Sequence, residues 1–174
     1  EADGVSFTTT SDTEALLHLF RRDGQSFVKR LRGMFALAIW DNVERSLFLA
    51  RDRLGGKPLH YAQTPRGLVF GSELKTLLAE GSLAREIDPT ALLDYLTLRY
   101  IPAPKTIWRD ARKLPAGHCL LYDGRRVELK QWWDLPPFAT RRESPERLAE
   151  ELWSLVLDSV KLRRVADVPL GAFL

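Results

Sequence analysis

The chain has 174 residues, of which 45% are apolar, so it is long enough to bury a hydrophobic core and is not a disordered segment. Its 26 basic and 23 acidic residues leave a net charge of +3, and the basic residues are scattered along the chain in pairs. A nucleic-acid-binding groove would gather them on one surface, so this distribution argues against such a partner.

A single cysteine, Cys119, excludes an internal disulfide and a cysteine-based zinc site within the chain. No apolar run approaches the roughly 20 residues of a membrane-spanning helix, and the N-terminus lacks a signal-peptide pattern. We therefore expect a cytoplasmic protein with no membrane partner. Because Glu1 is not an initiator methionine and Leu174 lies inside an apolar run, we also expect a fragment of a longer protein.

The first predicted helix begins at Ser11, which has the capping-box spacing to Glu14, and apolar residues follow at helical intervals. Gly24 ends this helix. A second, short helix carrying Phe27 and Val28 leads to Gly33. Both helices are candidates to cover the sheet that follows.

Residues 31–61 predict a meander of strands. Two apolar runs, Met34 to Trp40 and Leu47 to Ala50, are joined by a polar turn and followed by a charged, glycine-containing corner. The first run does not alternate between apolar and polar residues, so we expect its strand to be covered on both faces. A hairpin over residues 59–71 adds a fourth strand to the sheet.

The second half of the chain predicts further elements from caps and turns. Helices should start at Ser72 and at Asp88, where Pro89 suits the first turn, and a hairpin should surround Asp123-Gly124. Residues 135–144 contain two prolines and many polar residues, as in a linker. A long helix capped by Ser144 and a buried strand over residues 168–174 should follow. We therefore divide the chain into a domain at 1–134, a linker at 135–144 and the start of a second domain at 145–174.

No catalytic constellation is complete in the residues alone. His18, His60 and His118 lie on separate predicted elements with no pair at ligand spacing, which favours structural roles. Cys119 lies in an apolar strand, which favours an inert core residue over a nucleophile. Residues 55–58 lack the spacing and the hydroxyl of a phosphate-binding loop and favour a tight corner. We predict neither a catalytic residue nor a metal ligand here.

Several motifs follow one another along the chain, namely Ser11 to Glu14 (SDTE), Arg32 to Ala36 (RGMFA), Ala50 to Gly55 (ARDRLG) with Lys57 to Leu59 (KPL), Phe70 to Glu73 (FGSE), Ile101 to Ile107 (IPAPKTI), Lys113 to His118 (KLPAGH) and Asp167 to Leu174 (DVPLGAFL). In this order they resemble the later part of the glutaminase domain, and the start of the synthetase domain, of glutamine-hydrolysing asparagine synthetases of the bacterial type. The resemblance covers nearly the whole chain.

The resemblance implies an α+β layered sheet domain, part of an N-terminal-nucleophile hydrolase-like αββα glutaminase fold. The first helix and strand of an α/β ATP-pyrophosphatase-like domain would follow it. It implies an ATP-dependent ligase with glutamine, aspartate, ATP and Mg as substrates and cofactors, and a homodimer is one expected assembly. The nucleophilic cysteine, the phosphate loop and the magnesium-binding acids would lie outside these 174 residues, so the fragment alone should be inactive.

Three residues receive roles from the resemblance. Asp12 matches the acid that holds the α-amino group of glutamine, although it could also serve only the helix N-terminus. Met34 matches a position near the ammonia tunnel, with core packing as the alternative. Leu174 matches the last residue before the nucleotide-binding loop, with a core role in a buried strand as the alternative. Gly56 and Cys119 depart from the residues usual in the family, and we expect neither to touch the chemistry.

Two other functions stay open at this stage. A relative could amidate or cyclise a different carboxylate, because the selectivity for the acceptor would reside in the synthetase half. A non-catalytic regulatory module could also have kept this fold, since a fold alone does not establish an activity.

Overall fold

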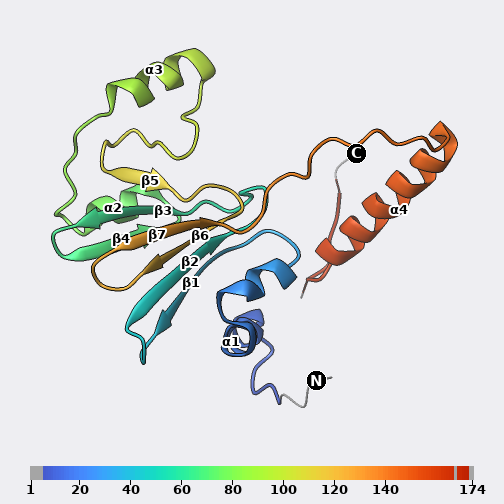
Figure 1. Ribbon diagram of the computed structural model, residues 1–174, viewed down its shortest axis with the longest axis horizontal. Helices are drawn as coiled ribbons and strands as arrows, with labels where there is room; N and C mark the ends of the chain where they lie inside the picture. Colours follow the sequence, from blue (N-terminus) through green and yellow to red (C-terminus); the bar gives the residue numbers. More distant parts are fainter. Residues whose placement is uncertain (1–5, 167, 173–174) are drawn as a thin grey trace. The chain divides into compact units, whose positions relative to one another are not determined.

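The computed structural model describes residues 6–166 and 168–172. The chain divides into two compact units, residues 1–134 and 135–174. Figure 1 labels the elements, which in chain order are α1 (Asp12–Asp23), the 3₁₀ helix η1 (Gly24–Arg30), β1 (Ala36–Asp41), β2 (Ser46–Arg51), β3 (His60–Thr64), β4 (Gly67–Gly71), α2 (Leu74–Ala79), α3 (Pro89–Leu98), β5 (Ala111–Lys113), β6 (His118–Tyr122), β7 (Val127–Gln131) and α4 (Pro145–Arg163).

The strands of the first unit form two antiparallel sheets, with the orders β1-β2-β6-β7 and β4-β3-β5. The predicted four-stranded meander is therefore wrong. The corner after β2 carries the chain out of the first sheet, and β3 starts the second one. In the first sheet the place beside β2 is taken by β6, with Leu49 opposite Leu120. A pairing between strands so far apart in the sequence cannot be predicted from the local apolar pattern, from which the meander was predicted.

Three buried clusters show how the layers stack. In the first, Phe27 and Val28 of η1 pack with Phe48 of β2, and apolar residues of α1 join them. In the second, Leu49 of β2 packs with Tyr61 of β3, so the two sheets face each other. In the third, Leu77 of α2 packs on the far face of the second sheet. The layer order is thus helix, sheet, sheet, helix.

The expectation that the first strand is covered on both faces is wrong for β1 and applies instead to β2. In β1, Leu37 and Ile39 are buried against the helical layer, whereas Ala38 and Trp40 on the opposite face are exposed. The four central residues of β2 are all buried, since β2 lies between the helical layer and the second sheet. Because Ala38 and Trp40 are apolar although they are exposed, the sequence of β1 does not alternate between apolar and polar residues.

Most of the predicted helix starts are confirmed. The Ser11 hydroxyl accepts a hydrogen bond from the Thr13 N–H at 3.2 Å, Asp88 caps α3, and Ser144 caps α4. Ser11 therefore caps α1, but the reciprocal bond of the predicted capping box does not form, because the Glu14 carboxylate binds residues 8 and 9 rather than the Ser11 N–H. α2 begins at Leu74 without a side-chain cap, and not directly after Ser72.

The second unit contains α4, whose side chains are exposed or half-buried. Arg141 forms ion pairs with Glu143 at 2.9 Å and with Glu151 at 2.7 Å. The predicted buried strand is wrong over residues 168–172, where the backbone is irregular and Leu170 is 59% exposed. Leu174 lies outside the described residues. None of the described helices is both long enough and apolar enough to cross a membrane.

Candidate functional site

A pocket of about 480 Å³ lies along β1, between the first turns of α1 and the corner that follows β2. Its volume falls in the range that small-molecule sites occupy. The charged residues of its lining are Asp12 and Lys57, and its hydroxyl side chains are those of Thr13 and Ser72. Most of the remaining lining is apolar. Asp12 and Lys57 could pair with charged groups of a small ligand, and the apolar lining could pack against its carbon atoms.

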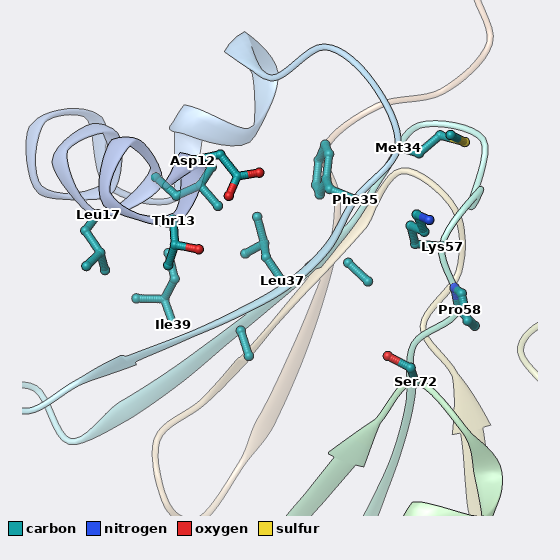
Figure 2. A pocket seen from close by; sticks show the side chains of 13 residues that line it. Asp12, Thr13, Leu17, Met34, Phe35, Leu37, Ile39, Lys57, Pro58 and Ser72 are labelled. Carbon is teal, nitrogen blue, oxygen red and sulfur yellow. The ribbon is translucent and has the colours of Figure 1, made fainter. Parts of the chain in front are cut away.

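Asp12 and Met34 lie on different walls of this pocket. Figure 2 shows Asp12 on α1 and Met34 near Lys57 and Pro58 of the corner, with β1 running between the two sides. Asp12 is the first residue of α1 and is exposed, so its carboxylate can meet a ligand. The positive end of the helix dipole favours a negative charge at this position. The two residues that the sequence singled out in the first unit therefore line one site.

Met34 is not a core residue, because it is 56% exposed and forms part of the pocket wall. It contacts the corner at Gly56, where an added Cβ would lie 2.9 Å from the Met34 Cγ atom and 3.1 Å from its sulfur. Gly56, which departs from the residue usual in the family, thus lies against a side chain of the pocket wall. The Met34 side chain occupies space that a larger residue at position 56 would need.

The corner is held by the three consecutive charged residues that end β2 and follow it. Arg51 donates hydrogen bonds of 2.7 Å to three backbone carbonyls, those of Gly55, Lys57 and Leu114. Arg53 donates to the carbonyls of Leu31 and Lys29, and its guanidinium lies 5.2 Å from the centre of the Trp132 ring. These side chains bind backbone groups of the fold and do not line the pocket.

Asp52, between the two arginines, is 2% exposed. Its carboxylate accepts four backbone N–H groups, those of Phe35 (3.2 Å), Leu54 (3.1 Å), Gly56 (2.9 Å) and Lys57 (3.0 Å). Burial would raise the pKa of Asp52, but the N–H groups stabilise the carboxylate and the pKa is lowered. The N–H groups of the corner are thus directed at a carboxylate of the same chain, which supports a tight corner rather than a phosphate-binding loop.

The other reactive side chains that the sequence offered lie apart from one another. His60 is on β3, where burial lowers its pKa and its Nδ1 atom lies 3.1 Å from the Ser72 carbonyl oxygen. His18 is on α1 and contacts Phe7 edge to face, and His118 is on β6. Cys119 is buried in the first core cluster, and burial raises the pKa of its thiol. A raised pKa disfavours the reactive thiolate.

Sequence reasoning missed Asp52, Lys57 and Ser72. Asp52 and Lys57 lie in a motif that identified a family, but neither received a role, and Ser72 was taken as a helix cap. One signal was available, namely the charged triplet at positions 51–53, which ends an apolar strand and is followed after one residue by two glycines. The role of Asp52 in the site cannot be inferred from this triplet alone, because its carboxylate binds the N–H of Phe35, which is 17 positions away.

Known proteins resemble this chain in sequence and in fold. A family model described as a glutamine amidotransferase domain matches residues 1–133. A protein of Methanocaldococcus jannaschii, provisionally named asparagine synthetase [glutamine-hydrolyzing] 2, is 36% identical over 170 residues, which are 95% of this chain and 33% of that protein. Asparagine synthetase [glutamine-hydrolyzing] 1 of Bacillus subtilis is 34% identical over 176 residues, which are 100% of this chain and 27% of that protein.

The chain thus spans about a quarter to a third of the length of these relatives. Among solved structures, one described as the allosteric regulatory enzyme of purine biosynthesis matches with a TM-score of 0.52 and 20% identity, over 76% of this chain and 24% of that one. At this identity the match concerns the fold alone, and it agrees with a mixed α/β domain built on antiparallel sheets.

Proposed function

The chain belongs to the glutamine amidotransferase domain family, and on that premise we propose that it is part of a glutamine-dependent asparagine synthetase, an ATP-dependent ligase. Residues 1–134 are then the later part of an N-terminal-nucleophile αββα glutaminase domain, residues 135–144 a linker, and residues 145–174 the start of the synthetase domain. The names of the relatives support this assignment. A cytoplasmic location and a homodimer stay predictions from the sequence.

The observation that carries the proposal is that Asp12 and Met34 line one pocket although they lie on different elements. In the proposed reaction glutamine is hydrolysed to glutamate and ammonia. The Asp12 carboxylate binds the α-amino group of glutamine, because an ionised acid accepts short, strong hydrogen bonds from an ammonium group. Position 12 at the start of α1 keeps this carboxylate at the pocket and within the field of the helix dipole.

Met34 provides an apolar wall on the corner side of the same pocket. Ammonia that leaves the glutamine site must stay unprotonated if it is to attack a second substrate. The Met34 side chain carries no N–H or O–H group that could donate this proton. We assign Met34 to the start of the ammonia passage for this reason.

In the second half of the proposed reaction, ATP activates the carboxyl group of aspartate and ammonia displaces AMP to give asparagine. In residues 6–166 and 168–172, no three His, Cys, Asp or Glu side chains gather in a way that could hold a metal ion. We assign no step of this half-reaction to the described residues. The proposed contact of Leu174 with the nucleotide stays a prediction.

The experiment compares two nitrogen sources in the full-length protein. Asp12→Ala should strongly reduce asparagine synthesis from glutamine and leave synthesis from free ammonia close to wild type, because ammonia bypasses the glutamine pocket. Asp23→Ala is the matched control, since it removes a carboxylate at the other end of α1, away from the pocket. An equal loss of both activities in Asp12→Ala would show that Asp12 only supports the helix.

Activity assays of the wild-type protein distinguish the asparagine synthetase from the two alternative functions. Hydrolysis of glutamine without consumption of aspartate would indicate a relative that acts on another carboxylate. Absence of both glutamine hydrolysis and ATP-dependent synthesis would indicate a non-catalytic module. Formation of asparagine and AMP in equal amounts from aspartate, ATP and glutamine is the result that we expect.

A further inference from the structure

Asp52 is the acid that joins the two sides of the corner to the start of β1. Three of its four N–H partners belong to the corner itself, at positions 54, 56 and 57, and the fourth is the N–H of Phe35. Phe35 is held a second time, because its carbonyl accepts a 2.9 Å bond from the Asp52 backbone N–H. The residue after Met34 is therefore anchored to the corner through one aspartate.

These contacts set the distance between two parts of the pocket wall. Phe35 belongs to the wall along β1, and Lys57 belongs to the wall along the corner. Both donate a backbone N–H to the same oxygen of Asp52, Oδ2. The other oxygen, Oδ1, binds the N–H of Gly56. One buried carboxylate thus holds both walls and the glycine beneath Met34.

Met34 is the side chain whose place depends on this arrangement. A Cβ at position 56 would clash with this side chain, because it would lie 2.9 Å from the Met34 Cγ atom and 3.1 Å from the sulfur. Figure 2 shows Met34 and Lys57 together on the corner side of the pocket. Gly56, unlike Gly55, has no left-handed backbone angle, so it is not the backbone that favours glycine at position 56. The contact with Met34 is the constraint that the structure places on this position.

We propose that Asp52 is a positioning residue of this pocket, which holds the corner at Gly56 and Lys57 against Phe35 and thereby seats Met34 in the space above Gly56. The inference rests on the proposed function in one respect, namely that the pocket handles glutamine and its ammonia. Asp52 does not itself line the pocket. It acts through the backbone of the residues that do.

The test uses the full-length protein with methyl-labelled methionine, in which Met34→Leu identifies the NMR signal of the Met34 methyl group. Asp52→Asn keeps the shape of the side chain but turns one accepting oxygen into an N–H₂ group that faces backbone donors. We expect the Met34 signal to shift by more than its linewidth. We also expect less asparagine per glutamine hydrolysed, with synthesis from free ammonia retained.

Two further variants make the test specific. Gly56→Ala leaves the Asp52 carboxylate intact but places a methyl group against Met34, so it should shift the same signal and lower the same ratio. Asp123→Asn is the control, because the Asp123 carboxylate also accepts two backbone N–H groups, at 2.9 and 2.8 Å, but in a hairpin turn away from the pocket. It should change neither the signal nor the ratio.

An unshifted Met34 signal in folded Asp52→Asn would overturn the proposal, as would an equal loss of the glutamine and ammonia activities. If Asp52→Asn does not fold, Asp52→Glu takes its place, because it keeps the carboxylate but lengthens the side chain that holds the four N–H groups, and an unshifted signal there has the same meaning. A wild-type protein that hydrolyses no glutamine would refute the proposed function instead. The NMR shifts would still report whether Asp52 and Gly56 position Met34.

Discussion

Replacing Arg51 by lysine should destabilise the protein, although the charge is kept. The guanidinium donates to three carbonyls, on Gly55, Lys57 and Leu114, each at 2.7 Å. Hydrogen bonds of charged donors contribute about 1.5–3 kcal/mol each, and a lysine ammonium cannot reproduce the planar fork of arginine. If lysine keeps one of the three bonds and water partly replaces the others, the free energy of unfolding should fall by about 2–4 kcal/mol.

Equilibrium urea denaturation measures this change, provided that the slope with urea is the same for both proteins. Arg66→Lys is the matched control, because the Arg66 side chain is 77% exposed and forms one ion pair of 3.7 Å with Glu80. Its effect should stay within about 0.5 kcal/mol. A loss below about 1 kcal/mol in Arg51→Lys would refute the reasoning, since the three carbonyls would then not depend on the guanidinium.

Two further predictions concern single titrating groups. The carboxylate of Glu14 accepts bonds from the N–H and hydroxyl groups of Thr8 and Thr9, led by the Thr8 N–H, and they lower its pKa from 4.5 to about 2. Its contribution to stability is therefore present above about pH 4.5 and is lost as the pH falls toward 2, and an NMR titration of this carboxyl group with a midpoint near its ordinary value would contradict the assignment. Cys119 is buried and the pKa of its thiol is raised, so it should resist iodoacetamide in the native protein at neutral pH and react after unfolding in urea. Peptide mass spectrometry measures this labelling, and rapid modification of native Cys119 would argue against its burial.

Local patterns were sufficient for features whose cause lies within a few residues. Ser11, Asp88 and Ser144 start helices because each side chain accepts an N–H of the turn that follows it. The hairpin around Asp123-Gly124 forms as expected, with Tyr122 opposite Val127. The order of the motifs indicated the family for the same reason, because a sequence motif can be recognised without knowing which residues it contacts in the fold.

Apolar patterns gave wrong predictions where the position of a strand depends on residues far away in the sequence. The apolar run of β1 predicted cover on both faces, yet Ala38 and Trp40 are exposed and β2 is the strand that packs on both faces. The run at residues 168–172 predicted a buried strand, but apolar content alone does not form a strand without a partner to pair with. Neither outcome can be read from the residues of the run itself.

The pocket shows the same division. The resemblance selected Asp12 and Met34 one at a time, and their common site appears only when α1, β1 and the corner pack together. Asp52 and Gly56 could not be connected to Met34 from the sequence, because the carboxylate reaches Phe35 across 17 positions and a glycine carries no side chain to suggest a contact. Capping and turn formation depend on neighbours along the chain, whereas the shape of the pocket depends on which distant backbone groups one buried acid can satisfy.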